Sequence, residues 1–234
     1  MNFRNLNRST RVRLVAVIAA CASFAFVASA AAVVYIYKNE FGSSSAFREI
    51  DQTGGGKKAC DESYSSGSES MRVEVSGRTF CEYSPPVTGD SAQPDHEIVA
   101  VGRILSDTPK NVRKQAYLAV RVRVGNDTFY EFRVNPKTKE YKLNRTPAGG
   151  GAGLPVSGES AEIAPLGEKN TLRLRVTGGN VTGFVNGTSV ANYDDPNPGQ
   201  VTGRNVAFGA GSTKDADNGP IGVFKSIKVG VPSP

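Results

Sequence analysis

Arginine occurs at alternating positions along several apolar stretches, a pattern that places charged side chains along one side of a strand. The candidate ligand-binding residues of this kind are Arg121, Arg123, Arg133, Arg173 and Arg175. Their apolar neighbours can point into a core only if these arginines point outward, because strand side chains alternate between faces. Guanidinium groups bind carboxylates and phosphates through paired hydrogen bonds. The pattern predicts a basic face for anionic glycans or cell-envelope polymers; alternatively, these are ordinary solvent-facing positions paired with nearby acids.

A second candidate binding element is the loop that begins with Tyr193, Asp194 and Asp195. A tyrosine ring can stack on a sugar while neighbouring carboxylates accept hydrogen bonds from its hydroxyl groups. Alternatively, Tyr193 caps the edge of the folded domain and the two aspartates help to form the turn. The sequence leaves both interpretations open.

Metal and catalytic chemistry find little support in the sequence. Asp194, Asp195, Asp215 and Asp217 offer the oxygen ligands that calcium prefers, but not in a recognisable ligand spacing, so we expect no metal and no cofactor. The single histidine, His96, has no nucleophile or metal-ligand partner in the pattern around it. We identify no catalytic residue.

Two cysteines, Cys60 and Cys81, are separated by 20 residues, and the third, Cys21, lies in an apolar N-terminal run. An even pair outside the cytoplasm predicts a disulfide, which would stabilise the fold by about 3 kcal/mol for a loop of this length. The spacing is not the Cys-x-x-Cys of redox enzymes.

The elements that would position these residues are strands. Apolar and polar residues alternate over 118–124, 130–134 and 172–176, and turn residues separate the stretches. Gly125-Asn126-Asp127 predicts one hairpin, and Asn186-Gly187 predicts another, with the positive φ angles of a type I′ turn. We therefore predict one antiparallel two-sheet sandwich over residues 70–231.

An apolar run of 24 uncharged residues, 14–37, precedes this domain and is long enough for a transmembrane helix in the lipid bilayer. Four arginines lie in residues 1–13 and no acid occurs before Glu40, so we predict a cytoplasmic tail and an extracytoplasmic domain. Two alternatives remain: signal-peptidase cleavage after Ala28-Ser29-Ala30, and lipidation at the lipobox-like Ile18-Ala19-Ala20-Cys21.

Residues 38–69 are rich in serine, glycine and charge, which predicts a flexible stalk. The overall basicity of the chain comes mainly from its tail. Of 28 basic residues four are in the tail, which leaves 24 against 22 acidic residues in the remainder. We therefore expect no nucleic-acid partner.

The order of several strand motifs resembles the concanavalin A-like (laminin G-like) jelly-roll domains of bacterial proteins. The motifs begin at Gln115 (QAYLAVRV), Phe129 (FYEFRV), Glu140 (EYKLNR), Asn170 (NTLRLRV), Gly183 (GFVNGTSVA), Val206 (VAFGAG) and Val223 (VFKSIKV). The resemblance covers about residues 71–231 and implies an all-β, antiparallel jelly-roll sandwich. Lectins, glycoside hydrolases, carbohydrate-binding modules and scaffold domains share this fold.

One departure from the family bears on activity. The Glu-x-Asp-x-x-Glu strand of laminarinase-type hydrolases is matched only by Glu49-Ile50-Asp51, and Gly54 stands where the second glutamate belongs. The sequence therefore favours a membrane-anchored, non-catalytic binding or adhesion module for a carbohydrate or envelope polymer. The alternatives are a glycan-active enzyme, which needs two carboxylates about 5–10 Å apart, and a scaffold subunit for another envelope protein, which needs an apolar patch.

Overall fold

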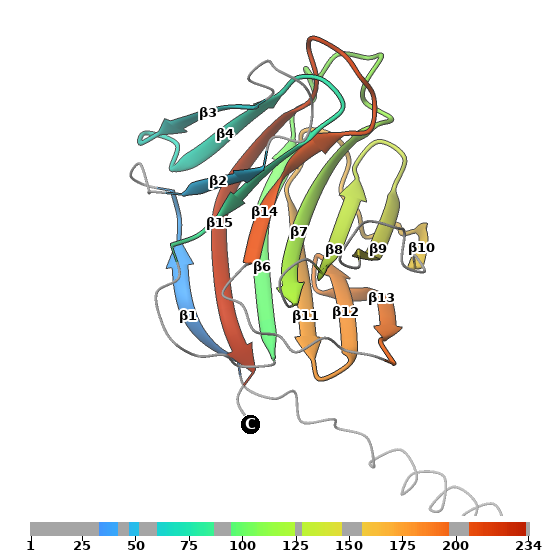
Figure 1. Ribbon diagram of the computed structural model, residues 1–234. Helices are drawn as coiled ribbons and strands as arrows, with labels where there is room; N and C mark the ends of the chain where they lie inside the picture. Colours follow the sequence, from blue (N-terminus) through green and yellow to red (C-terminus); the bar gives the residue numbers. More distant parts are fainter. Residues whose placement is uncertain are drawn as a thin grey trace, which may run out of the picture. The chain divides into compact units, whose positions relative to one another are not determined.

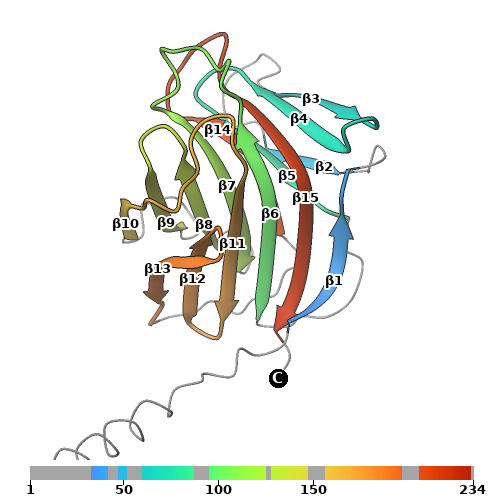
Figure 2. The same cartoon turned by 180° about the vertical axis from the view of Figure 1, so that it is seen from behind.

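The computed structural model describes residues 33–41, 47–51, 60–86, 95–124, 128–146, 156–196 and 206–232. The regular elements within these ranges are all strands, and they form two antiparallel sheets that pack face to face (Figure 1 and, from behind, Figure 2). Sheet A has the order β13 (Thr188–Asp194), β12 (Asn180–Val185), β11 (Asn170–Thr177), β6 (His96–Ile104), β15 (Ile221–Pro232), β4 (Ser70–Val75), β3 (Cys60–Ser65), with β1 (Val33–Asn39) also paired to β15. Sheet B has the order β10 (Val156–Glu159), β9 (Glu140–Thr146), β8 (Thr128–Asn135), β7 (Ala116–Val124), β14 (Val206–Ser212), β5 (Phe80–Ser84), β2 (Arg48–Asp51).

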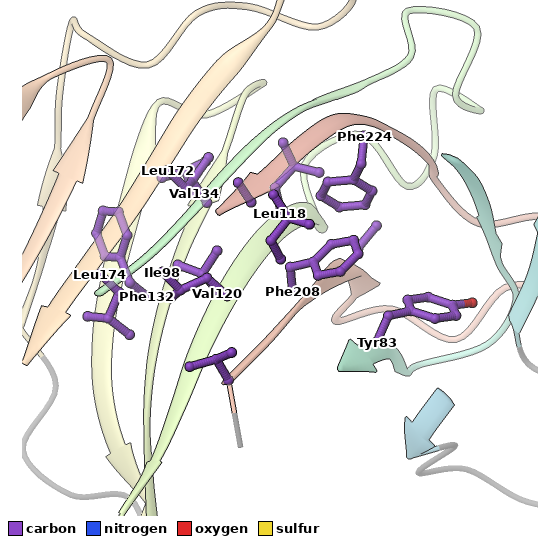
Figure 3. Close-up of a cluster of buried hydrophobic side chains, with 14 of the residues drawn as sticks. Tyr83, Ile98, Leu118, Val120, Phe132, Val134, Leu172, Leu174, Phe208 and Phe224 are labelled. Atoms are coloured by element: carbon purple, nitrogen blue, oxygen red, sulfur yellow. The ribbon is translucent and has the colours of Figure 1, made fainter. Parts of the chain in front are cut away.

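The predicted alternation is confirmed in the core between the sheets. Leu118 and Val120 of β7 and Phe132 of β8 are buried against Leu172 and Leu174 of β11 (Figure 3). Nearer β5, aromatic rings fill the space between the sheets at Tyr83, Phe208 and Phe224. Burial of these side chains is the main favourable contribution to folding.

The predicted Asn186-Gly187 hairpin is also confirmed. Both residues have positive φ, 50° and 94°, and the turn joins the paired residues Val185 and Thr188. The Asn186 side chain accepts a hydrogen bond from the backbone N–H of Thr171 at 2.8 Å, which fixes the turn against β11. Residues 125–127 lie outside the described residues, but β7 and β8 pair up to either side of them.

The disulfide is present, with Cys60 and Cys81 bonded and their Cα atoms 5.6 Å apart. Both cysteines are fully buried. Because Cys60 begins β3 in sheet A and Cys81 lies in β5 of sheet B, the bond joins the two sheets at one edge of the sandwich.

The N-terminal boundaries differ from the prediction. Strand β1 contains residues 33–37, which the apolar pattern assigned to the end of a transmembrane helix, and it pairs with β15. Strands β2 and β3 lie within the predicted stalk and pair with β5 and β4. These polar strands gain backbone hydrogen bonds at sheet edges, a source of stability that hydrophobic periodicity does not register. The sandwich therefore begins at residue 33 rather than 70.

The predicted tail and most of the apolar run, residues 1–32, lie outside the described residues. Within the described ranges no helix is long and apolar enough to span a membrane. The apolar run that precedes β1 is residues 14–32, or 19 residues. A helix of that length would measure about 28 Å, close to the roughly 30 Å of a bilayer's hydrocarbon layer.

Candidate binding surfaces

The predicted arginines do not share one face. Arg121 and Arg133 lie on the outer face of sheet B, whereas Arg173 and Arg175 lie on the outer face of sheet A. Arg123 belongs to β7, but its side chain lies outside what the structure describes. Period two correctly predicts which way a side chain points relative to its own sheet. It carries no information about which of the two layers a strand joins, so the condition for one shared basic face, that these arginines lie on the same sheet, is not met by these four.

Two glycines in β14 shape the outer face of sheet B. A Cβ on Gly211 would meet the Tyr117 ring at 2.5 Å, and a Cβ on Gly209 would meet Phe80 at 3.1 Å. Without side chains at these positions, Phe80 from β5 and Tyr117 from β7 lie over β14 and stack on each other, with centroids 5.8 Å apart and planes at 17°. The centre of this face is therefore filled by the protein's own rings.

Arginines continue this stack in both directions. The Arg121 guanidinium lies 4.2 Å from the centroid of Phe80 and 4.5 Å from that of Phe129, and the Arg133 guanidinium lies 4.9 Å from that of Tyr117. The resulting order, which we name the arginine–aromatic ladder, is Phe129, Arg121, Phe80, Tyr117, Arg133. Guanidinium groups stack favourably on aromatic faces, so these ring faces are already occupied and offer little area for stacking a sugar.

Two buried carboxylates flank Arg121. Glu82 and Glu131 are 0 % and 5 % exposed. Arg121 Nη1 binds Glu82 Oε2 at 2.5 Å, and its Nε and Nη2 bind Glu131 Oε2 at 2.7 and 2.6 Å. Burial alone would lower the pKa of Arg121, but the carboxylates of Glu131 and Glu82 outweigh it and raise that pKa above its ordinary value. The guanidinium charge is therefore permanent.

A glycan-active enzyme would need two carboxylates near each other, and Glu82 and Glu131 both bind one guanidinium. However, Arg121 uses one oxygen of each and carries a fixed positive charge between them. Sequence reasoning missed Glu82. All five residues of β5, Phe80–Ser84, are buried, so this strand lacks the alternation of apolar core residues and polar surface residues by which the other strands were recognised.

Two pockets open beyond the Tyr117–Arg133 end of the ladder. The first, of about 80 Å³, is lined by Lys114, Gln115, Tyr117, Arg133, Asn135, Glu140, Lys142 and Thr213. The second, of about 310 Å³, is lined by Lys110, Asn111, Arg113, Lys114, Gln115 and Lys137. Because they share Lys114 and Gln115, we treat them together as the basic groove.

The groove combines fixed and exposed cations. Arg113 is held in place by hydrogen bonds to the carbonyls of Thr108 and Ser106, both at 2.7 Å. Its exposed lysines are Lys110, Lys114, Lys137 and Lys142. The acid in its lining is Glu140, whose carboxylate accepts a hydrogen bond from Thr138 at 2.8 Å. This excess of ammonium and guanidinium groups suits a ligand that carries carboxylate, sulfate or phosphate.

Burial raises the pKa of the Tyr117 hydroxyl, which lines the groove, to about 12. Tyr117 is therefore protonated at physiological pH and its hydroxyl can donate a hydrogen bond. Gln115 and Asn135 add amide groups, although Asn135 Nδ2 already donates to the Lys114 carbonyl at 2.7 Å.

The predicted Tyr193–Asp195 sugar site does not form as a unit. Asp195 is buried, accepts a hydrogen bond from the Tyr130 hydroxyl at 2.6 Å and pairs with Arg145 at 2.5 Å. Tyr193 packs against the core, and Asp194 accepts a hydrogen bond from Asn180. Burial, together with the neighbouring Asp195 carboxylate, raises the pKa of the Tyr130 hydroxyl, so Tyr130 keeps its proton and donates it to the hydrogen bond with Asp195. The alternative interpretation, a structural role at the sandwich edge, fits Tyr193 and Asp195.

On the outer face of sheet A, Glu97 is the counterpart of Glu82. It is fully buried, pairs with Arg175 at 2.7 Å and lies 3.9 Å from Arg173. The Tyr35 hydroxyl donates to its second oxygen at 3.3 Å. The Arg173 guanidinium stacks on Phe184 at 3.7 Å from the ring centroid. Arg173 and Arg175 therefore hold an internal carboxylate instead of forming an open site.

No group of three or more histidine, cysteine or acidic side chains within the described ranges is arranged to hold a metal ion. An acidic pocket does occur, lined in part by Asp61, Glu74, Asp107 and Asp217. His96 is buried at the start of β6, and its Nδ1 has no hydrogen-bond partner among the described residues. Burial lowers the pKa of this imidazole, against a smaller opposite effect of Asp95.

No model of a known protein family matches the sequence, and no curated protein resembles it. Solved structures do share its architecture. The β-glucanase of Bacillus licheniformis superimposes with a TM-score of 0.60 at 10 % identity, over 82 % of this chain and 96 % of that chain. A β-1,3-1,4-glucanase (lichenase) from a mouse hindgut metagenome gives 0.59 at 8 % identity, over 84 % and 99 %. The CBM2 module of the evolved Dit protein of Lactobacillus casei BL23 phage J-1 gives 0.54 at 8 % identity, over 86 % and 97 %.

The protein therefore has a concanavalin A-like jelly-roll fold, as its strand motifs predict. At identities near 10 % the likeness establishes the fold alone. Two of these structures are glucanases and the third is a CBM2 module, so the fold does not decide between catalysis and binding.

Proposed function

We propose that the protein is a membrane-anchored, extracytoplasmic binding module that recognises an anionic carbohydrate or cell-envelope polymer through the basic groove, without cleaving it. The observation that carries the proposal is the groove itself: four exposed lysines and two arginines converge from two segments, 110–114 and 133–142. Lysine and arginine are the side chains that bind carboxylate and phosphate groups. The glycan-related structures with this fold support a carbohydrate as the polymer.

Arg121 supports the non-catalytic part of the proposal. A hydrolase of this kind needs one carboxyl group that donates a proton and one that acts as base or nucleophile. Glu82 and Glu131 are buried and both bind the same guanidinium, which occupies one oxygen of each and separates them from water and substrate. Neither carboxyl group is therefore open to a bound glycan.

The proposal is tested by measuring affinity of the full chain, held in neutral lipid nanodiscs, for polygalacturonate and for a phosphate-containing teichoic acid. Neutral β-glucan and dextran serve as comparison polymers. We expect binding to the anionic polymers that weakens steeply with salt, because the contacts are charge–charge. Equal affinity for the neutral polymers would overturn the proposal, and release of new reducing ends would overturn its non-catalytic part.

Matched variants assign the binding to the groove. The combined change Lys114→Gln, Lys137→Gln and Lys142→Gln removes three exposed charges without touching the core, and we expect about a tenfold or greater loss of affinity. Lys169→Gln, an exposed lysine outside the groove, is the control and should bind as wild type does. Similar losses in both proteins would show non-specific attraction and no groove.

A further inference from the structure

Three cations form one cross-strand row on the outer face of sheet A. Lys38 of β1 lies directly opposite Lys228 of β15. On the other side of β15, Lys228 lies opposite Val99 of β6. Val99 lies opposite Arg173 of β11, which completes the row. Side chains in one such row point to the same face of a sheet, and neighbouring strands are about 4.8 Å apart. We name Lys38, Lys228 and Arg173 the cationic row; it extends roughly 15 Å across four strands.

This arrangement costs the folded protein stability, because like charges directly opposite each other in a sheet repel. The carboxylate on this part of the face, Glu97, lies in the neighbouring row and is engaged by Arg175 and Tyr35. Among the residues that the structure describes, no carboxylate pairs with Lys38 or Lys228. The two lysines instead lie on Tyr35, 5.3 and 5.7 Å from its ring centroid. Within the described part of the chain, the fold leaves Lys38 and Lys228 without a neutralising carboxylate, whereas Arg173 lies 3.9 Å from Glu97.

Exposed apolar residues adjoin the cationic row. Val34, Tyr35 and Ile36 of β1 are 60 %, 37 % and 44 % exposed, and they are the exposed large hydrophobic side chains of the described residues. Of these three, Tyr35 shares the outer face with Lys38, and Gly230 of β15 makes room for its ring, which a Cβ there would meet. Tyrosine flanked by lysine is the composition of a membrane–water interface, where the ring and the lysine stems contact lipid and the charges reach headgroups.

In the sequence, the proposed anchor ends where this strand begins. Val33, the first residue of β1, directly follows the apolar run 14–32, with no linker between them. Resting on the proposed anchor, we infer that the outer face of sheet A beside β1 docks on the surface of a bilayer that contains anionic lipids. Lys38 and Lys228 contact the headgroup phosphates, and the Tyr35 ring, on the same outer face, lies at the interface.

This docking assigns different surroundings to the two sheets. Sheet A faces the membrane, and sheet B, with the basic groove at its end, faces away from it. The electrostatic attraction acts only within a Debye length, about 8 Å at physiological salt. A domain that begins immediately at the membrane meets this condition, whereas a domain on a stalk of 32 residues would not.

The test uses the full chain in nanodiscs of neutral lipid or of lipid with about 30 % anionic headgroups, probed by lysine acetylation and mass spectrometry. We expect Lys38 and Lys228 to react about threefold or more slowly in the anionic discs, and about 0.5 M salt to restore their rates. Lys142, on sheet B, is the internal control and should react alike in both. Equal rates for Lys38 and Lys228 in the two discs would overturn the inference.

A variant pair separates docking from general attraction of a basic protein. Iodination of Tyr35 should be slowed in anionic discs for wild type and for Lys114→Gln/Lys142→Gln, but not for Lys38→Gln/Lys228→Gln. Slowing in all three proteins would overturn the role of the cationic row. A chain that fails to stay with the discs would overturn the anchor and this inference with it, whereas stable insertion with unshielded lysines overturns the docking alone.

Discussion

The outer faces of the two sheets are built from the same kinds of residue and arrange them differently. On sheet B, Arg121 lies between two buried glutamates and two aromatic rings, so each charge is matched within the face. On sheet A, Glu97 takes up Arg175 and Tyr35, but the row of Lys38 and Lys228 next to it has no such match among the described residues. On sheet B the charges at the centre are paired, and the cations without such partners lie in the basic groove at one end. On sheet A the cations without such partners, Lys38 and Lys228, lie on β1 and β15. The difference teaches that charge type alone does not identify a site; the arrangement of partners does.

Replacing the central arginine of each face should give the largest contrast. Arg121→Leu leaves Glu82 and Glu131 buried without their guanidinium, and we expect a loss of about 3–5 kcal/mol in the free energy of unfolding. Arg175→Leu should cost less, because Arg173 and Tyr35 remain near Glu97. Urea unfolding of both variants measures the difference. Equal losses would mean that the two faces hold their acids in the same way.

The second largest difference is expected between glycine-to-alanine substitutions on the two faces. A Cβ on Gly209 of β14 would overlap the carbonyl oxygen of Cys81, which is backbone and cannot turn aside, so Gly209→Ala should cost roughly 1–3 kcal/mol. The nearest atoms to a Cβ on Gly230 of β15 belong to the side chains of Val33 and Tyr35 in the edge strand β1. Thermal unfolding should therefore show a smaller loss for Gly230→Ala, and the reverse order would argue against β1 as the more adaptable element.

Sheet A should also be the acid-sensitive layer, through His96. Its folded-state pKa lies below the ordinary value near 6.5, so the neutral imidazole is favoured in the fold. The associated stability is fully present above the unfolded-state pKa and is lost as the pH falls below about 6.5. Urea unfolding at several pH values should show this loss in wild type and a flatter profile in His96→Gln. Identical profiles would place the acid sensitivity elsewhere.

The smallest expected effect concerns the lysine pair of sheet A. Salt screens the repulsion between Lys38 and Lys228, so added salt should stabilise wild type by a few tenths of a kcal/mol more than it stabilises Lys228→Met. Lys169→Met, which changes an exposed lysine outside the strands, serves as the control and should behave as wild type does. A salt response that is the same in all three proteins would show that the pair costs nothing, and would remove one support for the docking surface.

The sequence predicted the elements with local signals. The alternation at Leu118 and Val120, the Asn186-Gly187 turn and the Cys60–Cys81 pair all depend on neighbouring residues or on a count, and all three are confirmed. The end of the apolar run, residues 33–37, forms part of a strand, because its β-branched and aromatic residues suit a lipid-facing helix and a sheet strand equally well. Pairing with β15 decides between them, and that partner lies nearly 200 residues further along the chain.

By itself, then, the sequence determined the fold class, the strand faces, the principal turn and the apolar run before residue 33, since each follows from side-chain period, backbone preference or length. Tertiary structure alone decided which arginines share a face, because layer and register join residues far apart in the chain. It brought Glu82 to Arg121 across β14, joined two lysine-lined loops into a groove, and set Lys38 opposite Lys228. Those long-range juxtapositions create the surfaces on which the proposed functions depend.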